Sequence, residues 1–325
     1  MPKRTPKNFW VPVARAARYP SGVLIVRELS ELAALHAPLH LALGVFDGVH
    51  LGHQAVIGEA VAAAAAAGGL AGVLTFDPHP ACVLGPQAGP CALVATLEHK
   101  ARLVAACGVG LFIPLRFDQA MARMAAAEFL DHLLAAPIRT LAVGEDWRFG
   151  RGRHGDVELL RERTAPAGIA LAAVPIVLVE GERVSSTRIR QAIRDGSLAA
   201  AARMLGRPYS LCGTVVEGRK LGRLLGFPTA NVAIGEVLTP PDGVWAVRVS
   251  ITGGPPRPGI ANLGMRPTVA GTARLLEVHL LDFSGDLYGQ EIEVEFVRYQ
   301  RAELKFASLD LLRAQIAEDV RQVRE

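Results

Sequence analysis

The first half of the chain alternates apolar runs with runs of helix-forming residues. The apolar runs have the length and composition of buried strands and lie at 39–45, 73–76, 111–115, 138–143 and 169–179. Helix formers fill the segments 54–67 and 120–134, and Asp118 stands where it can cap the second of these helices. This alternation predicts a parallel sheet with helices on both faces.

After Gly206-Arg207-Pro208 the pattern changes to short alternating segments separated by turn glycines. These segments are 210–216, 243–249, 274–282 and 290–296. In the third of them, Val278 and Leu280 alternate with Glu277 and His279, which is typical of a half-buried strand. Regularly spaced short strands predict a small antiparallel barrel. Residues 308–323 predict a final amphipathic helix.

This change of pattern predicts the domain organisation. We expect a basic tail over residues 1–20, a Rossmann-like parallel α/β domain over 21–206, and a β-barrel domain with a C-terminal helix over 207–325. A chain of 325 residues is long enough for two domains of ordinary size. The predicted fold class is therefore α/β followed by β.

Composition narrows the range of partners and locations. The formal net charge of +4 is mild. The chain has no stripe of interleaved basic and aromatic residues, which would indicate nucleic-acid binding. No uncharged apolar run has the length and flanks of a membrane span. The four cysteines show no Cys-x-x-Cys spacing and indicate neither a disulfide framework nor a zinc site. We therefore expect a cytoplasmic protein, a monomer or weak homo-oligomer, with small-molecule partners.

The stretch from Gly44 to His53 joins a predicted strand to a predicted helix and reads Gly-Val-Phe-Asp-Gly-Val-His-Leu-Gly-His. Backbone N–H groups at a helix start favour an anion, and His50 and His53 share one face of the first turn. Imidazoles there suit the negative charge that develops on a phosphate. The pair alternatively binds a metal or caps the helix, but no His-Glu-x-x-His pattern supports a metal. Phosphate chemistry is the preferred interpretation.

Two other segments of this half carry polar groups near the expected site. Sites in parallel α/β folds lie beyond the carboxyl ends of the strands, where the turns carry His50, His79 and Asp146. Residues 185–188, Ser-Ser-Thr-Arg, open a predicted helix. A serine N-cap alone explains this sequence, whereas hydroxyls and an arginine at a helix start also form a phosphate clamp. Arg190 either joins the clamp or faces solvent.

A second glycine-bearing stretch opens the barrel half, from Gly222 through Gly226 to Asn231. Its glycines let the backbone approach a ligand, and Pro228 stiffens the end of the loop. Thr229 and Asn231 place side-chain oxygens on one face of an extended segment, which suits Mg²⁺ held jointly with nucleotide phosphates. A simple turn into a barrel strand explains the same residues without a ligand.

These stretches resemble one family. Residues 44–53 resemble the flavin-adenylating branch of the nucleotidylyltransferases, and Pro-Thr-Ala-Asn at 228–231 resembles the riboflavin kinase signature. The segments 259–268, 276–283, 285–289 and 301–306 fit the same pattern. Over about residues 39–320 the chain is similar to the bifunctional riboflavin kinase/FAD synthetase family of bacteria.

The resemblance implies two reactions that use ATP and Mg²⁺: riboflavin to FMN in the barrel domain, and FMN to FAD with release of pyrophosphate in the α/β domain. It implies that His50, His53 and Arg188 act on ATP phosphates and that Glu277 is the base for the ribityl hydroxyl. It implies ligand-binding roles for Gly44, Phe46, Asp47, Gly48, Asp146, Phe149, Ser186, Thr187, Gly222, Gly226, Pro228, Asn262 and Arg301, and metal ligation by Thr229 and Asn231.

Two other functions explain part of the pattern. An adenylyl- or cytidylyltransferase acting on pantetheine phosphate or glycerol phosphate would leave the barrel motifs unexplained. A non-catalytic flavin sensor would not need Glu277, since binding alone requires no base. Without the resemblance, Glu277 would be expected in solvent or paired with an arginine such as Arg301.

Overall fold

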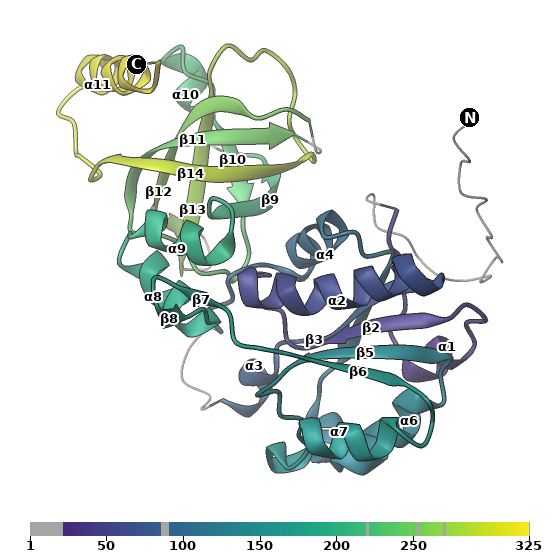
Figure 1. The fold of residues 1–325 in the computed structure, drawn as a ribbon. Coiled ribbons are helices and arrows are strands. Elements are labelled where there is room, and N and C mark those ends of the chain that lie inside the picture. The colour runs from purple at the N-terminus through teal and green to yellow at the C-terminus, as the bar shows by residue number, and fades with distance from the viewer. Residues whose placement is uncertain (1–21, 86–90, 219–220, 252–253, 269–270, 325) are drawn as a thin grey trace. The chain divides into compact units, whose positions relative to one another are not determined.

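A computed structural model describes residues 22–85, 91–218, 221–251, 254–268 and 271–324, so the predicted basic tail at 1–20 lies outside the described residues. The chain forms two compact units. The sheet unit comprises Met1–Val45, Ala55–Gly85 and Ala101–Pro175, and the barrel unit comprises Phe46–Gln54, Pro86–Lys100 and Ile176–Glu325. Each unit is described by itself below (Figure 1).

A six-stranded parallel sheet forms the centre of the sheet unit, in the order β1-β4-β3-β2-β5-β6. Its strands are β1 (Leu24–Ile25), β2 (Leu39–Leu43), β3 (Leu70–Asp77), β4 (Leu111–Arg116), β5 (Ile138–Gly144) and β6 (Ala170–Val174). All five pairings are parallel. The central strand β2 is buried at all five positions, as its continuous apolar sequence requires. The predicted parallel sheet is confirmed.

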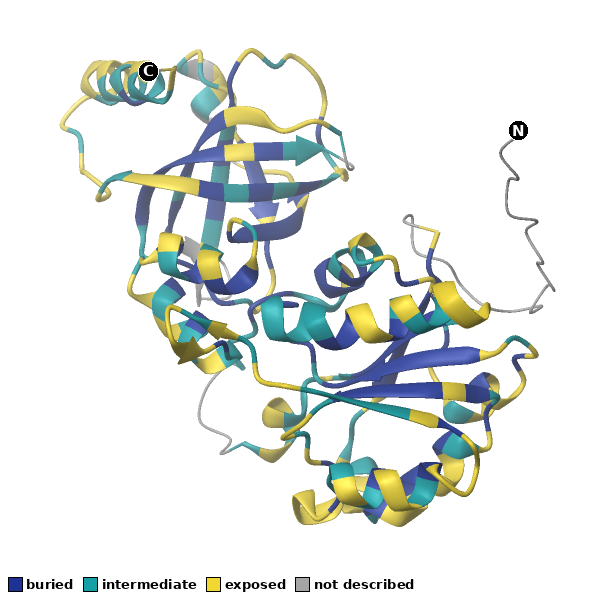
Figure 2. Cartoon of the chain, in the orientation of Figure 1, coloured by how far each residue is buried: buried dark blue, intermediate teal, exposed yellow. Residues whose placement is uncertain are grey.

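Helices cover both faces of this sheet, with α2 on one side and α6 and α7 on the other (Figure 1). The helices of this half are α1 (Leu29–Ala33), α2 (Leu51–Ala67), α3 (Pro80–Leu84), α4 (Leu97–Ala106), α5 (Gln119–Arg123), α6 (Ala126–Leu134), the 3₁₀ turn η1 (Arg151–Arg153) and α7 (Val157–Thr164). Figure 2 shows the buried strands between these partly exposed helices. Among the described residues, no helix has the length and apolar character needed to cross a membrane.

The single helix predicted at 120–134 is two helices, α5 and α6. Asp118 caps α5 as expected, accepting hydrogen bonds from the backbone N–H groups of Ala120 and Met121. Met124 then adopts an extended conformation, with φ −63° and ψ 129°. Its carbonyl accepts a hydrogen bond at 2.8 Å from the N–H of Arg151. This contact, distant in sequence, ends a helix that local propensity would continue.

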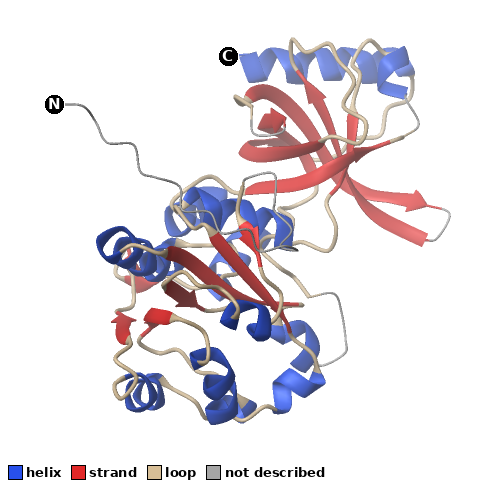
Figure 3. Cartoon of the chain, turned by 90° about the vertical axis from the view of Figure 1, so that its right-hand side faces the viewer, coloured by secondary structure: helices blue, strands red, loops and turns tan. Residues whose placement is uncertain are grey.

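The barrel unit holds a closed antiparallel barrel in the order β10-β13-β12-β11-β14-β9. Its strands are β9 (Ser210–Val216), β10 (Ala230–Ala233), β11 (Gly243–Ile251), β12 (Arg257–Thr268), β13 (Gly271–Leu280) and β14 (Glu291–Arg301). The remaining elements are the hairpin β7 (Leu178–Val179) and β8 (Glu182–Arg183) and the helices α8 (Ser186–Arg194), α9 (Leu198–Leu205), α10 (Leu221–Leu224) and α11 (Leu309–Arg324). Figure 3 shows α11 beside the barrel strands. The predicted barrel and final helix are confirmed.

The barrel unit begins before the predicted domain boundary at residue 206. Ile189 and Leu205, from α8 and α9, belong to one hydrophobic core with Leu211 and Val247 of the barrel. The compact units therefore do not divide at the point where the sequence pattern changes. The boundary at 206 between the two expected domains stays a prediction.

The cysteines differ from the sequence expectation in one respect. Cys82 and Cys91 are disulfide-bonded, whereas Cys107 and Cys212 are thiols. The sequence showed no spacing that indicates a disulfide framework, so it did not predict the bonded state of these two cysteines.

Candidate active sites

The histidine pair lies where the loop from β2 meets α2, with His50 just before the helix and His53 in its first turn. Phe46 and Gly48 both have positive φ angles, of 50° and 77°. A Cβ atom on Gly48 would lie 2.6 Å from a methyl carbon of Val94, so only glycine fits this position. The loop brings His50 to the start of α2, where its Nδ1 accepts a hydrogen bond at 3.2 Å from the N–H of His53. His50 therefore caps the helix, which was one of the alternatives for the pair.

The two imidazole rings stack on each other. Their centroids lie 3.5 Å apart and their planes differ by 16°. Since Nδ1 of His50 accepts a hydrogen bond, the proton of the neutral ring is on Nε2. Burial lowers the pKa of His50 to about 4. Burial and the neighbouring His50 hold the pKa of His53 well below its usual value. Both rings are thus neutral at pH 7 and act as hydrogen-bond donors rather than as cations.

The lowered pKa of His50 predicts a pH-dependent stability. In the unfolded chain this histidine is protonated as pH falls through 6.5, but in the folded chain it resists protonation down to about 4. Its contribution to the free energy of unfolding is fully present above pH 6.5 and is lost as pH falls toward 4, by up to about 3 kcal/mol. Urea unfolding of the wild type and of His50→Asn between pH 7 and pH 4.5 measures this loss.

The variant His50→Asn is matched because asparagine is itself a good helix N-cap but does not titrate. We expect its stability to fall less steeply with decreasing pH than that of the wild type. Parallel curves for the two proteins would mean that His50 is exposed enough to keep an ordinary pKa.

Positive charge at the histidine pair comes from neighbouring side chains. Arg183 and Arg207 lower the pKa of His50. Lys100 and Arg190 lower the pKa of His53. A group of cations beside neutral N–H donors attracts a polyanion such as a nucleotide triphosphate. The sequence motifs pointed to Arg188 instead, because isolated basic residues outside a motif carry no signal.

Asp47 is a buried carboxylate with partners inside the protein. It is 2% exposed and accepts hydrogen bonds at 3.0 and 3.1 Å from the N–H of Val94. It also forms an ion pair at 2.7 Å with Arg190, whose Nε donates to the carbonyl of Ala92. Arg190 therefore does not face solvent. Asp47 fixes α8 and the 92–95 segment beside the histidines, and a direct contact with substrate stays a prediction.

The start of α8 contributes hydroxyl groups to this region. Ser185 is the N-cap, accepting a hydrogen bond at 3.3 Å from the N–H of Arg188. Ser186 donates through Oγ to the carbonyl of Asp47 at 3.2 Å. The guanidinium of Arg188 is held by β8, through a carbonyl at 2.6 Å and a carboxylate at 2.5 Å. Thr187 is exposed. The structure thus places Ser186 at the motif loop, and the clamp role of Thr187 and Arg188 stays a prediction.

The carboxyl end of β5, in the sheet unit, carries the residues assigned to the flavin. Asp146 is exposed in the turn after this strand. Phe149 is only 6% exposed and belongs to the core of the unit. It stacks on the half-buried Trp147, with ring centroids 4.5 Å apart and planes 14° apart. Phe149 thus supports Trp147 from behind, and its direct contact with a flavin stays a prediction.

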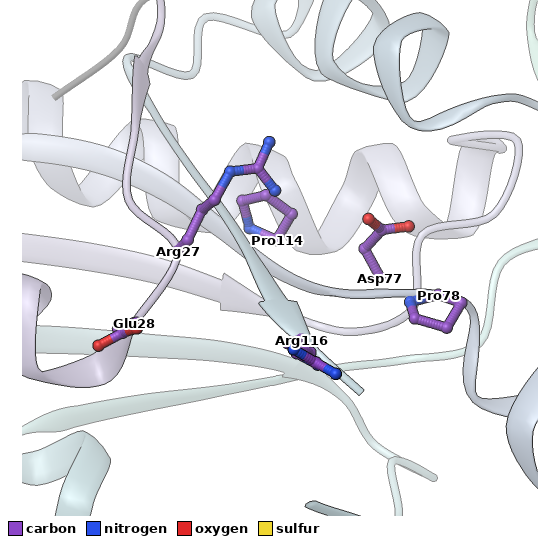
Figure 4. A pocket seen from close by; sticks show the side chains of 6 residues that line it. All are labelled: Arg27, Glu28, Asp77, Pro78, Pro114 and Arg116. Carbon is purple, nitrogen blue, oxygen red and sulfur yellow. The ribbon is translucent and has the colours of Figure 1, made fainter. Parts of the chain in front are cut away.

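A pocket of about 410 Å³ lies at the carboxyl ends of β1, β3 and β4 (Figure 4). It is lined by Arg27, Glu28, Asp77, Pro78, Pro114 and Arg116. Two guanidinium groups and two carboxylates suit a ligand with both anionic and hydrogen-bonding groups. No sequence motif indicates this pocket, because its residues come from three separated segments.

Strand register places four candidate residues in one row around the barrel. Glu277 of β13 is the partner of Asn231 on β10 and of Asn262 on β12. Asn262 is in turn the partner of Val244, whose other partner is Arg301. Partners on antiparallel strands point to the same face with Cβ atoms about 5 Å apart. The alternate residues of these strands fill the barrel core, so this row lies on its outer face.

Glycines let the loop before β10 approach this row closely. A Cβ atom on Gly218 would lie 1.9 Å from Nδ2 of Asn231. A Cβ atom on Gly222 would lie 3.1 Å from Oγ1 of Thr229. Gly226 has a φ angle of 85°, which a side chain would strain. Gly218 was missed in the sequence because it precedes the recognised loop.

His279 ties the same loop to β13. Its Nδ1 forms a hydrogen bond at 2.8 Å with the carbonyl of Pro228, and its ring packs edge-on against Phe227. Val278 is fully buried, and Glu277 and His279 both lie on the opposite face of the strand. This is the arrangement that the alternating sequence predicted.

Arg301 is bound by the final helix rather than by Glu277. Its Nε and Nη2 donate to the two carboxylate oxygens of Asp319, at 2.9 and 2.6 Å. Asp319 is 3% exposed and also accepts a hydrogen bond from Gln315. The alternative in which Arg301 serves as the salt-bridge partner of Glu277 is therefore wrong. Asp319 was missed because one acid in an amphipathic helix resembles an ordinary surface residue.

This buried ion pair predicts that Asp319→Asn lowers the stability of the protein. Removing one partner leaves a mostly buried guanidinium uncompensated, which costs about 3 kcal/mol. We expect the free energy of unfolding in urea to fall by that amount. The control is Glu318→Gln, which removes the neighbouring carboxylate that pairs with Arg321 at the surface and should change stability little. Equal losses in the two variants would contradict a structural role of the buried pair.

Together these features define a class: a parallel α/β unit with a His-Leu-Gly-His helix start, joined to an antiparallel barrel, is typical of a nucleotide-dependent transferase with two parts. Residues 33–188 match the FAD synthetase family model, and residues 205–325 match that of riboflavin kinase. The chain belongs to the bifunctional riboflavin kinase/FMN adenylyltransferase family.

Individual relatives agree with this assignment. The bifunctional riboflavin kinase/FMN adenylyltransferase of Escherichia coli (strain K12) is 43% identical over 287 residues, which are 88% of this chain and 91% of that protein. The one from Pseudomonas fluorescens is 40% identical over 303 residues, 92% of this chain and 96% of that protein. A crystal structure described as a macrolide-efflux protein from Streptococcus pneumoniae has a TM-score of 0.80 at 30% identity, covering 94% of this chain and 99% of that one.

Proposed function

We propose that the chain makes FAD from riboflavin in two ATP-dependent steps. The barrel domain phosphorylates riboflavin to FMN, and the α/β domain transfers AMP to FMN with release of pyrophosphate. The observation that carries this proposal is the presence of both sites in one chain: the histidine pair at the start of α2, and the row of Asn231, Glu277 and Asn262 on the barrel. Both family matches support it.

In the kinase reaction, Glu277 accepts the proton of the ribityl hydroxyl as that oxygen attacks the γ-phosphorus of ATP, and the bond from this phosphorus to the β-phosphate oxygen breaks so that ADP leaves. Asn231 and Asn262 flank Glu277 in the barrel row. A base held within reach of the attacking hydroxyl raises the rate by about 10²–10⁴. A non-catalytic flavin sensor would not need a carboxylate at this position of the barrel row.

The barrel site has a donor set that fits Mg²⁺. The side-chain oxygen of Asn262 is buried and makes no hydrogen bond in the described part of the chain. Amide, hydroxyl and carboxylate oxygens are the ligands that Mg²⁺ prefers. We propose that Thr229 and Asn231 hold the ion, with Asn262 beside them. When bound, Mg²⁺ neutralises charge on the phosphoryl group that is transferred.

In the adenylylation reaction, the neutral imidazoles of His50 and His53 donate hydrogen bonds to phosphate oxygens as charge accumulates on them. Lys100 and Arg183 supply the positive potential, since they already act on the two histidines. Donors fixed in advance need no reorganisation in the transition state. The role of Asp47 in this scheme is to hold the loop and α8 in place.

The test is incubation of the pure protein with riboflavin, ATP and Mg²⁺, followed by chromatographic separation of the flavins. We expect FMN to appear first and FAD afterwards, with one pyrophosphate for each FAD. Omitting Mg²⁺ should stop both steps. FMN without FAD, or no flavin product, would contradict the proposal. Small molecules as the only partners, a monomeric or weakly oligomeric state and a cytoplasmic location complete the proposal.

A further inference from the structure

Three side chains with metal-binding atoms meet on the barrel unit away from the proposed catalytic residues. They are His99 in the first turn of α4, Cys212 on β9 and Glu293 on β14, and one donor atom from each lies within 4.8 Å of the others. Cys212 and Glu293 are register partners, so their side chains leave the barrel on the same face. This cluster joins residues that the family motifs do not include.

The histidine of this cluster is buried, and one nitrogen of its ring has no hydrogen bond to a described residue. His99 is 3% exposed, and its Nε2 makes no hydrogen bond within the described part of the chain. The nearest carboxylate oxygen, Oε1 of Glu293, is 3.5 Å away, beyond good hydrogen-bond geometry. A buried imidazole nitrogen of this kind normally has a partner, because desolvation without one is costly. A ligand bound between Nε2 of His99 and Oε1 of Glu293 would give this nitrogen a partner.

The spacing of the donors fits a tetrahedral metal ion. Zinc binds nitrogen and oxygen at about 2.0 Å and sulfur at about 2.3 Å, which puts its donors roughly 3.3–3.6 Å apart. The separation between His99 and Glu293 is already 3.5 Å. Imidazole, thiolate and carboxylate together favour Zn²⁺ over the harder Mg²⁺.

A supporting hydrogen bond holds one of the three ligand side chains. Ser210 donates through its hydroxyl to Oε1 of Glu293 at 2.6 Å. A partner of this kind orients a metal ligand and commonly contributes 10- to 100-fold to affinity. The backbone N–H of His99 donates to Oγ1 of Thr96 at 3.1 Å, which fixes the start of α4.

We propose that His99, Cys212 and Glu293 form a zinc site, with a water molecule as the fourth ligand. The ion would fasten the first turn of α4 to strands β9 and β14. The backbone just before this turn is already held by Asp47 at Val94, and Lys100 of the same turn acts on His53. The site is therefore a structural clamp on a segment that contributes to the histidine site.

The clamp is distinct from the kinase row on the same barrel. Glu293 precedes Arg301 by eight positions on β14, and Cys212 precedes Val216, the partner of Asn231, by four positions on β9. At about 3.4 Å per residue these separations are roughly 27 and 14 Å. The two groups therefore lie at different levels of the barrel.

Cobalt is the probe for this site, because Co²⁺ takes tetrahedral zinc sites and is coloured. We would strip the full-length protein with a chelator, restore excess Mg²⁺, and titrate with Co²⁺. We expect one Co²⁺ per chain, intense visible bands of four-coordinate cobalt and a near-ultraviolet band from thiolate. Zn²⁺ should displace the cobalt and raise the melting temperature.

Variants identify the ligands. Cys212→Ser should abolish the thiolate band, and His99→Gln and Glu293→Gln should weaken binding at least about 100-fold, while Ser210→Ala should weaken it about tenfold. Cys107→Ser and the double variant Cys82→Ser, Cys91→Ser are controls that should keep the band. A wild-type protein without the band, or a band that survives in Cys212→Ser or disappears in the double variant, would overturn the proposal. If Cys212→Ser does not fold, undiminished binding by Glu293→Gln, whose side chain is partly exposed, would overturn it equally.

Discussion

His53→Ala is expected to lower kcat/KM for FMN adenylylation by about two to three orders of magnitude, the effect of losing one donor to a developing negative charge. The structure adds a reason specific to this residue. His50 caps α2 through its own Nδ1, so His53 is not needed as the cap. Nδ1 of His53 is buried and makes no hydrogen bond in the described part of the chain. Beside Lys100 and Arg190, the two cations that act on His53, this nitrogen can serve a ligand.

Both activities must be measured on this variant. Riboflavin phosphorylation should be unchanged, because the kinase row is built from other strands. His132→Ala, which removes an exposed histidine from α6, is the matched control and should leave both rates unchanged. Adenylylation at the wild-type rate in His53→Ala would show that the ring serves only to pack against His50 and Phe46.

The fold was largely predictable because periodicity records burial. Continuous apolar runs such as 39–45 gave the parallel strands, and alternation around Val278 gave the barrel. Local signals failed where a distant residue decides the conformation. Met124 ends a helix because Arg151 binds its carbonyl, and α8 and α9 share a hydrophobic core with the barrel although they precede the change of sequence pattern at Gly206.

The candidate site was predictable only in its motif residues. His50, Glu277 and Asn231 stand in recognisable strings, but Lys100, Arg183 and Asp319 do not. These three act through position in the fold, and a single charged residue in a sequence usually indicates a solvated surface. The neutral state of the histidine pair was also hidden, because it arises mainly from burial, which lowers the pKa of both rings.

The second large effect is expected for Glu277→Gln. The substitution keeps the shape of the side chain and removes its basicity. Loss of a positioned base should lower kinase turnover by about 10²–10⁴. Riboflavin and Mg²⁺-ATP should still bind with nearly normal affinity, and supplied FMN should still be converted to FAD. The control is Glu295→Gln on β14, whose carboxylate pairs with Arg248 at the barrel surface.

The general-base role of Glu277 stays a prediction that experiment must separate from a purely structural role. Glu277 is half-buried and its register partners are two asparagines, while Arg301 of the same row is bound by Asp319. Flavin binding measured by fluorescence quenching, together with both rates, separates the remaining possibilities. Unchanged turnover would exclude proton transfer to Glu277. Loss of binding and turnover together would mean that the carboxylate holds the site in shape, since a general base alone contributes to kcat and not to affinity.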